Sequence, residues 1–218
     1  MITRLDHLVV AAADLAQGVA WVRDRLGIEV PYGGEHSAMG THNHLMKLGE
    51  DCFLEVIAID PAARSPGRPR WFGLDDPSVR QRLAIQPALL SWVVNSDGLD
   101  RLLAEAGCPY GRAEPVSRGT LHWQFGMPED GRLLGGGLLP YAIQWPSDRH
   151  PAAAMADRGC RLQMLTLYHP YPDWLAEMLD SINASNLVDI QSLSPDQAPY
   201  LAATIDTPSG AKRLESPL

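Results

Sequence analysis

One histidine and one glutamate stand in strongly apolar segments, where chemistry would explain their presence. His7 lies in the middle of the first apolar segment, and Glu55 lies in the run Phe53-Leu54-Glu55-Val56-Ile57. In a strand Glu55 shares a face with Phe53 and Ile57, so it points either to solvent or into a cavity with apolar walls. Because burial of an unpaired carboxylate costs several kcal/mol, we expect a partner or a metal ion beside Glu55.

A second pair of polar residues occupies corresponding places later in the chain. Aligning residues 8–10 with 92–94 places Ser91 opposite His7. Aligning residues 54–56 with 143–145 places Gln144 opposite Glu55. The two alignments have similar spacing, so together they predict one pseudo-symmetric site.

The elements that must hold these residues repeat along the chain. Asp14 and Gln17 have the spacing of a helix capping box, and Gly27 is a typical left-handed helix end. In the first copy we expect strands at 5–10, 41–48 and 52–59 and a helix at 14–26. In the second copy we expect strands at 89–94, 120–127 and 138–145, a helix at 97–106 that Asp97 caps, and a bulge or bend at 135–137.

A third, shorter copy follows, with strands expected at 162–168, 188–193 and 200–206 and a helix at 173–182. Between the copies, residues 61–82 and 147–159 are rich in Pro, Arg and Asp and are expected as surface connections. A unit that cannot bury its own sheet must pair with another copy. We therefore predict an α+β fold in which paired βαβββ modules form a cupped mixed sheet with helices 14–26 and 97–106 outside. The expected domains are residues 1–147, with modules at 1–60 and 87–147, and a partial βαββ module at 160–218 packed on the first.

This layout resembles the vicinal oxygen chelate superfamily, which includes glyoxalase I, extradiol dioxygenases and bleomycin-resistance proteins. More narrowly, Gly40-Thr41-His42-Asn43-His44-Leu45 before Phe53-Leu54-Glu55, and the later run at 135–145, are similar to the glyoxalase-like domain branch. The likeness covers most of residues 3–147 and, less specifically, the third copy. It implies paired modules that curl into a cup and hold a divalent metal between them.

The resemblance also implies roles for individual residues. His7 and Glu55 match two metal-ligand positions, Glu55 is the candidate catalytic residue, and Gln144 stands at a third ligand position where another carboxylate is usual. Imidazole, carboxylate and amide oxygen could hold Zn, Ni, Mn or Fe with open positions for a substrate. Ser91 departs from the pattern, because metal-binding members usually carry His or another good donor there. The alternative is a metal-free cavity in which His7 and Glu55 bond each other or water.

Several further residues are candidates for contact with a substrate. By the resemblance, His36 and Asn43 are candidate substrate-binding residues, and Ser91 and Trp92 in the second copy are further candidates. His42 and His44 share a strand face but lack further donors nearby, which favours a polar face over a separate metal site. Arg64, Arg68 and Arg70, beside Trp71 and Phe72, either hold an anionic substrate or belong to a solvated connector.

Composition excludes several classes of protein. The net charge of −8 and the 45% hydrophobic content indicate a globular protein and argue against nucleic-acid binding. No stretch approaches the roughly 20 apolar residues that span a bilayer, and the first residues have no signal-peptide layout, so we expect a cytoplasmic protein. The three cysteines form no CxxC pair, and no GxGxxG, GxxxxGK[ST] or GxSxG motif is present.

Two functions follow from these observations. The first is a divalent-metal-dependent enzyme of the lyase, isomerase or dioxygenase type that acts on a small oxygenated substrate. The second is a metal-free protein that binds and sequesters a small molecule, as the resemblance to bleomycin-resistance proteins allows. The expected partner is a small molecule, and we expect binding to neither nucleic acid nor membrane. A homodimer is a further possibility.

Overall fold

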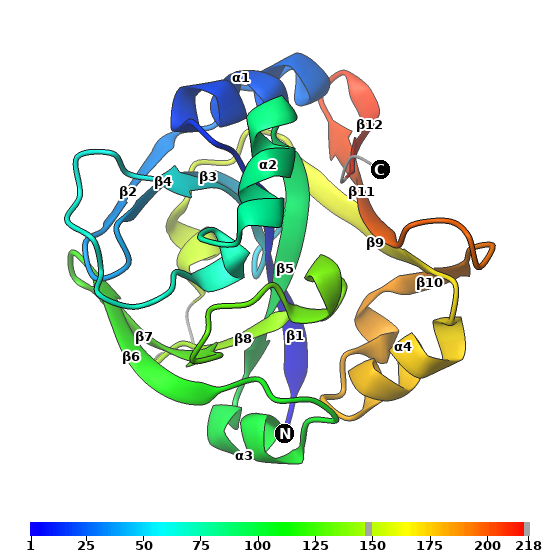
Figure 1. Ribbon diagram of the computed structural model, residues 1–218. Coiled ribbons are helices and arrows are strands. Elements are labelled where there is room, and N and C mark those ends of the chain that lie inside the picture. Colours follow the sequence, from blue (N-terminus) through cyan, green and yellow to red (C-terminus); the bar gives the residue numbers. More distant parts are fainter. Residues whose placement is uncertain (147–149, 216–218) are drawn as a thin grey trace.

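The computed structural model describes residues 1–146 and 150–215, and its larger part is a strongly curled eight-stranded sheet (Figure 1). The strand order is β2-β3-β4-β1-β5-β8-β7-β6. The strands are β1 (Thr3–Ala11), β2 (Tyr32–His36), β3 (Thr41–Lys47), β4 (Phe53–Ile59), β5 (Ala88–Ser96), β6 (Arg112–Arg118), β7 (Leu121–Met127) and β8 (Tyr141–Gln144). The predicted α+β fold of two paired modules that form a cupped mixed sheet is confirmed.

The centre of the sheet explains why distant residues meet. β1 pairs antiparallel with β5, so the first strands of the two modules lie side by side. Each is also parallel to the last strand of its own module, β1 to β4 and β5 to β8. The first and last strands of both modules therefore form the middle of the cup.

Helices cover the outside of this sheet. In α1 (Leu15–Leu26), the Asp14 side chain accepts a hydrogen bond from the Gln17 amide at 3.0 Å, and Gly27 ends the helix at φ 73°. The predicted cap and end of this helix are confirmed. In α3 (Leu99–Glu105) the N-cap is Gly98 and not Asp97, because the Asp97 carboxylate instead accepts the Ile2 amide at 2.8 Å.

Some elements escape prediction from the sequence. The connection at 61–82 contains η1 (Trp71–Gly73) and the start of α2 (Pro77–Ile85), in which the Asp76 carboxylate caps the helix and only Val79 and Leu83 are buried. Residues 135–137 belong to the short helix η2 (Leu134–Gly137) and not to a strand bulge. The connection at 147–159 contains η3 (Pro151–Ala154), and its residues 147–149 lie outside the described residues.

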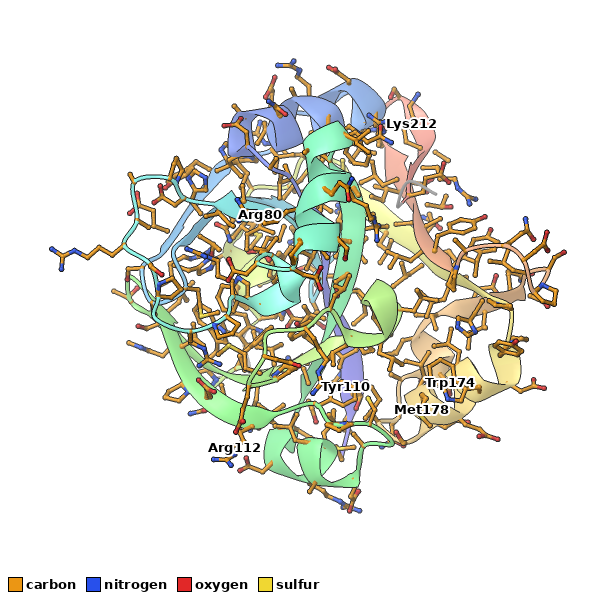
Figure 2. All side chains as sticks on the ribbon, viewed as in Figure 1. Arg80, Tyr110, Arg112, Trp174, Met178 and Lys212 are labelled. Atoms are coloured by element: carbon orange, nitrogen blue, oxygen red, sulfur yellow. The ribbon has the colours of Figure 1, made fainter. Side chains whose placement is uncertain are left out.

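The last third of the chain forms a four-stranded sheet in the order β10-β9-β11-β12. Its elements are β9 (Arg161–His169), α4 (Pro172–Asp180), η4 (Ser185–Leu187), β10 (Asp189–Ser192), β11 (Tyr200–Thr207) and β12 (Gly210–Glu215). This sheet packs on the larger one through β5 and α1. On α4, Met178 packs against the chain at Gly107, whereas Trp174 is 44% exposed (Figure 2). No helix in the described part of the chain is long and apolar enough to cross a membrane.

Gly136 and Gly137 of η2 give a matched test of how tightly this turn packs against β5. A Cβ at Gly137 (φ 102°) would lie 2.1 Å from the carbonyl oxygen of Leu90, whereas one at Gly136 (φ 65°) would meet nothing within 4 Å. Gly136→Ala should lower the free energy of unfolding by roughly 1–2 kcal/mol, the cost of left-handed backbone. Gly137→Ala should cost at least about 2 kcal/mol more, because the turn must move off the strand. Urea unfolding of both variants measures the difference, and equal losses would contradict this packing.

Candidate functional site

A narrow cavity lies on the concave face of the larger sheet, with a volume of about 40 Å³. Its polar side is formed by His7, His36, Asn43, Glu55 and Arg118. The remaining walls are apolar or aromatic and are formed by Leu45, Phe53, Trp71, Phe72, Trp123, Phe125, Ile143, Trp145, Pro151 and Met155. Glu55 is 5% exposed in this cavity, so its placement by strand alternation agrees with the structure.

An irregularity in β1 places two adjacent side chains together. Leu5 pairs with Val94 and His7 pairs with Val93, so Asp6 is an extra residue between two regular pairs. At such a bulge the alternation of side chains is interrupted. As a result the Asp6 carboxylate reaches back to the neighbouring imidazole, with Asp6 Oδ1 2.5 Å from His7 Nδ1.

Asp6 is a fully buried carboxylate that three side chains contact within residues 1–146 and 150–215. Besides His7, the Trp145 indole donates to Asp6 Oδ2 at 2.7 Å, and His150 Nε2 lies 2.9 Å from the same oxygen. Burial acts to raise the pKa of Asp6, but the hydrogen bonds and positive charge of His150 and His7 outweigh it and lower the pKa to about 2. Asp6 is therefore an anion that can only accept hydrogen bonds.

The ionised state of Asp6 determines which ring nitrogen of His7 carries a proton toward it. Because a carboxylate cannot donate, His7 Nδ1 must carry the proton that joins the two residues. The other ring nitrogen, Nε2, then faces Glu55 Oε2 at 3.7 Å, too far for a direct hydrogen bond. Both atoms are thus directed at the same point, where a substrate atom or a water can bind to each.

Glu55 belongs to a polar chain that crosses the mouth of the cup. Asn43 Nδ2 donates to Glu55 Oε1 at 2.6 Å, and Arg118 Nη1 donates to Asn43 Oδ1 at 3.1 Å. Arg118 comes from β6 and Asn43 from β3, so this contact joins the two outer parts of the curled sheet. Burial lowers the pKa of the Arg118 guanidinium, and the charge of Glu55 opposes that shift.

Two consecutive glycines leave room for this chain. A Cβ at Gly33 would lie 2.4 Å from Asn43 Oδ1, and one at Gly34 would lie 3.1 Å from Arg118 Cδ. Both glycines are on β2, the edge strand that approaches β6. The missing side chains on β2 therefore permit the asparagine and the arginine to meet.

His36 contributes a neutral imidazole to the cavity. Its Nδ1 lies 3.1 Å from Thr41 Oγ1, and its ring meets Trp71 and Trp123 edge to face. Burial lowers the pKa of His36 to about 4, with the charges of Arg118 and His7 acting in the same direction and Glu55 opposing. At neutral pH this side chain offers hydrogen bonds without adding charge.

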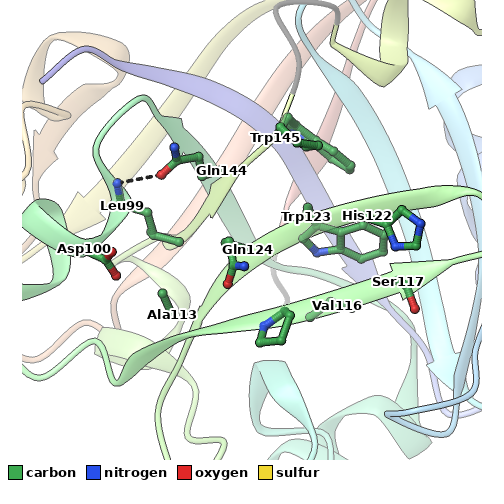
Figure 3. Close-up of a pocket in the computed structure, with 12 residues that line it drawn as sticks. Leu99, Asp100, Ala113, Val116, Ser117, His122, Trp123, Gln124, Gln144 and Trp145 are labelled. Atoms are coloured by element: carbon green, nitrogen blue, oxygen red, sulfur yellow. Dashed lines mark hydrogen bonds between the residues drawn. The ribbon is translucent and has the colours of Figure 1, made fainter.

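The structure does not bring Gln144 to His7 and Glu55. Gln144 Oε1 accepts a hydrogen bond from the Leu99 amide at 3.0 Å, at the start of α3 and in a separate open pocket of about 680 Å³ (Figure 3). Val9 pairs with Glu55, and its equivalent Val93 pairs with Tyr141, which makes Tyr141 the counterpart of Glu55. The alignment of this strand in the sequence was therefore three residues out of register, and an odd offset reverses the face of a strand.

The other candidates divide between the cavity and the core. His36 and Asn43 line the cavity as expected. Ser91 and Trp92 are fully buried and do not line it, because the Trp92 indole donates to the Leu138 carbonyl at 2.9 Å inside the sheet. The expectation that these two residues contact a substrate is thus not met by this geometry.

Three of the neighbouring histidine and arginine candidates have structural partners. His44 Nδ1 contacts the Val30 carbonyl at 2.6 Å. Arg70 pairs with Asp75 at 2.7 Å, and Arg68 pairs with Glu114. These ion pairs favour the connector interpretation of the arginine-rich segment, although Trp71 and Phe72 at its end do line the cavity.

The donor set does not fit a resident divalent metal ion. In residues 1–146 and 150–215, no group of three or more His, Cys, Asp or Glu side chains is placed to hold a metal. His7 and Glu55 lie together, His36 bonds Thr41 instead, and the Arg118 guanidinium lines the same cavity. Because a cation already faces Glu55, a second cation would be repelled.

Asp6, Arg118 and His150 are functional candidates that sequence reasoning missed. Strand alternation places Asp6 on the face opposite His7, and only the bulge reverses this. Arg118 lies on a polar edge strand without apolar alternation, and His150 lies in a connector. A carboxylate next to His7 in an apolar strand is the one sequence signal that could have suggested a paired histidine.

Comparison with known proteins assigns the chain to a family. Residues 5–182 match the family described as glyoxalase-like domain, which is well over half of the 218 residues. The chain belongs to the glyoxalase-like domain family. The resemblance drawn from His7, Glu55 and the glycine-rich runs is therefore confirmed. Among curated proteins, none matches this glyoxalase-like chain.

Solved structures resemble this glyoxalase-like protein at low identity. A hypothetical protein from Staphylococcus aureus has a TM-score of 0.58 at 14% identity, over 92% of this chain and 81% of that chain. A methylmalonyl-CoA epimerase from Mycobacterium tuberculosis has a TM-score of 0.40 at 21% identity, over 66% of this chain and 89% of that chain. A variant of 4-hydroxymandelate synthase from Streptomyces coelicolor has a TM-score of 0.46 at 15% identity, over 98% of this chain and 62% of that chain. The first of these likenesses shows the fold alone.

Because Asp6 is a buried anion, the free energy of unfolding should fall as the pH is lowered into the acidic range. Its pKa is about 2 in the folded protein against 3.8 for the free side chain, so its stabilisation is present above pH 3.8 and is lost as pH falls toward 2. The contribution is about 2 kcal/mol. Asp6→Asn should remove this acid-dependent loss and also lower stability at pH 7, because an amide cannot accept from three donors.

Urea unfolding at a series of pH values from 2 to 7 measures both effects. Asp157→Asn is the matched control, since the Asp157 pKa is also lowered but the carboxylate lies outside the cavity. A stability profile for Asp6→Asn that follows the wild-type profile would contradict the proposed burial of this anion.

Proposed function

We propose that this glyoxalase-like protein is an enzyme that moves a proton to and from carbon on a small oxygenated acid. The observation that carries the proposal is the pair His7 Nε2 and Glu55 Oε2. These two atoms lie 3.7 Å apart, and both residues line the same cavity. Groups that share such a point can hold a substrate hydrogen and the atom that bears it. The reaction belongs to the lyase or isomerase type, and the substrate class is a carbonyl or hydroxy acid.

The reaction starts at the Glu55 carboxylate. Glu55 removes a proton from the hydroxyl-bearing carbon next to a carbonyl group, and the electrons of the C–H bond pass to the carbonyl oxygen. The resulting enediolate oxygen lies against positive charge and hydrogen-bond donors from Arg118 and His36. Glu55 then returns the proton to the former carbonyl carbon, and the hydroxyl proton of the substrate passes to the former carbonyl oxygen, which completes an isomerisation.

Arg118 takes the part that a metal ion would otherwise have in stabilising negative charge. A guanidinium stays charged and donates in a fixed plane to oxygen atoms. Its partner Asn43 also bonds Glu55, so the cation and the base are held by one side chain. We therefore propose that the divalent metal of the enzyme hypothesis is not needed at this site.

Binding without turnover is the second candidate function. The observation in its favour is the lining of the cavity, in which apolar and aromatic side chains surround a few polar ones, as is typical of small-molecule sites. In that function the carboxylate and imidazole would only hydrogen-bond the ligand. Isotope exchange separates the two functions, because retention alone exchanges no carbon-bound hydrogen.

Deuterium exchange should detect the proposed proton transfer. In D₂O the wild-type protein should place deuterium on C3 of pyruvate or hydroxypyruvate, followed by proton NMR. Glu55→Gln keeps the bond from Asn43 and removes the base, so exchange should fall by about 10²–10⁴-fold, the usual contribution of a general base. Glu35→Gln, an exposed carboxylate on β2, should leave exchange unchanged. Equal rates in wild-type protein, in Glu55→Gln and in buffer would sink the enzyme proposal.

Metal removal should leave this activity intact. The protein purified and dialysed against a chelator should exchange deuterium at the same rate as before, and salts of Mn, Fe, Ni or Zn should not raise its melting temperature. The physical reason is the presence of Arg118 beside Glu55, which repels a divalent cation. Elemental analysis with one metal per chain, lost in Glu55→Gln, would instead favour the metal-dependent enzyme.

A further inference from the structure

The residues that line the cavity differ in how far they can move. Phe72, 2% exposed, has left-handed backbone at φ 57°, which is uncommon for a bulky residue. Its amide donates to the Tyr141 hydroxyl at 3.0 Å, and that hydroxyl donates to the Arg132 carbonyl at 2.5 Å. The Phe72 and Tyr141 rings also pack with centroids 4.8 Å apart. This wall is held by backbone and ring contacts together and has little freedom to move.

The segment that covers the other side is anchored at its start. His150 bonds Asp6 through Nε2, and its Nδ1 accepts the Ala152 amide at 3.2 Å. Ala152 is fully buried, so the backbone of η3 is fixed against the sheet. Of the cavity-lining residues that follow His150, Pro151 is rigid, whereas Met155 is unbranched and only partly buried. Among the lining residues of this segment, Met155 is therefore the side chain that a longer ligand could displace.

The charges in the cavity limit what can bind. Arg118 is the one guanidinium among the lining residues, and Glu55 lies in the same cavity. Asp6 adds a second buried negative charge behind His7. One anionic group can pair with Arg118, but a second would face carboxylates without a partner.

We infer that the cavity selects monoanionic acids of two or three carbons and that Met155 sets the upper limit of chain length. This inference rests on the proposed function, because it names the substrate class of the same site. A volume of about 40 Å³ has room for only a few water-sized groups, at about 10–15 Å³ each, so an acid of a few heavy atoms fills it. Each further methylene must push Met155 outward, because the Phe72 wall and η3 are held in place.

Ligand-induced shifts in melting temperature test the length limit directly. The probes are glyoxylate, pyruvate, 2-oxobutyrate, 2-oxopentanoate and 2-oxohexanoate, with oxaloacetate as the dianion. Wild-type protein should be stabilised by the first two, and affinity should fall by about tenfold or more for each added methylene, as in a closed pocket. Oxaloacetate should give no shift.

Variants of Met155 identify the residue that sets the limit. Met155→Ala should bind 2-oxopentanoate at least as tightly as wild-type protein binds pyruvate, whereas Met155→Leu, of similar volume, should keep the wild-type profile. Met164→Ala is the matched control, because Met164 is 46% exposed on β9 and outside the cavity. Met155→Leu keeps the test valid if Met155→Ala does not fold. The inference assigns the limit to the volume of this side chain, so a changed dependence on chain length in Met155→Leu would overturn it.

Three results would overturn the inference. They are a wild-type affinity that does not fall with chain length, no shift with any of the acids, and a limit that Met155→Ala leaves in place. The proposed function fails separately, because protein that binds pyruvate with the expected length limit but exchanges no deuterium would retain the inference and lose the enzyme. Protein that exchanges deuterium but binds the acids without a limit on chain length would retain the proposed function and lose the inference.

Discussion

The buried carboxylate of Asp6 is the interaction on which the site depends. A buried anion is costly unless donors surround it, and here three side chains supply them. His7 lies next to it in β1, Trp145 follows β8 in the second module, and His150 precedes η3. One anion therefore fixes the imidazole, the end of the second module and the segment that covers the cavity.

A second constraint comes from the closure of the curled sheet. β2 and β6 are the two edge strands of the eight-stranded order, and the cup brings them near each other. Gly33 and Gly34 remove the side chains that would fill this approach, so Arg118 can reach Asn43. The positive charge at the mouth is thus a consequence of sheet curvature and of two residues without a Cβ.

Much of the fold could be predicted because its apolar pattern is strong. Alternation along Phe53 to Ile57 placed Glu55 on the concave face, and capping residues placed the first helix. Polar edge strands carry no such pattern, which hid β2, β6 and therefore Arg118. The register of a strand is decided by pairing, so Gln144 was aligned three residues away from the correct position. The bulge at Asp6 depends on the packing of β1 against β5, and no local sequence feature specifies it.

Asp6 orients His7 so that Nε2 is free to face Glu55, and the tautomer of His7 tests this arrangement most directly. Nitrogen and proton NMR of the histidine rings should be recorded with ¹⁵N-labelled protein at alkaline pH. His7 should carry its proton on Nδ1, with a downfield proton signal that is lost in Asp6→Asn, while Nε2 is unprotonated. A His7 ring with its proton on Nε2, or a spectrum that Asp6→Asn leaves unchanged, would contradict this arrangement.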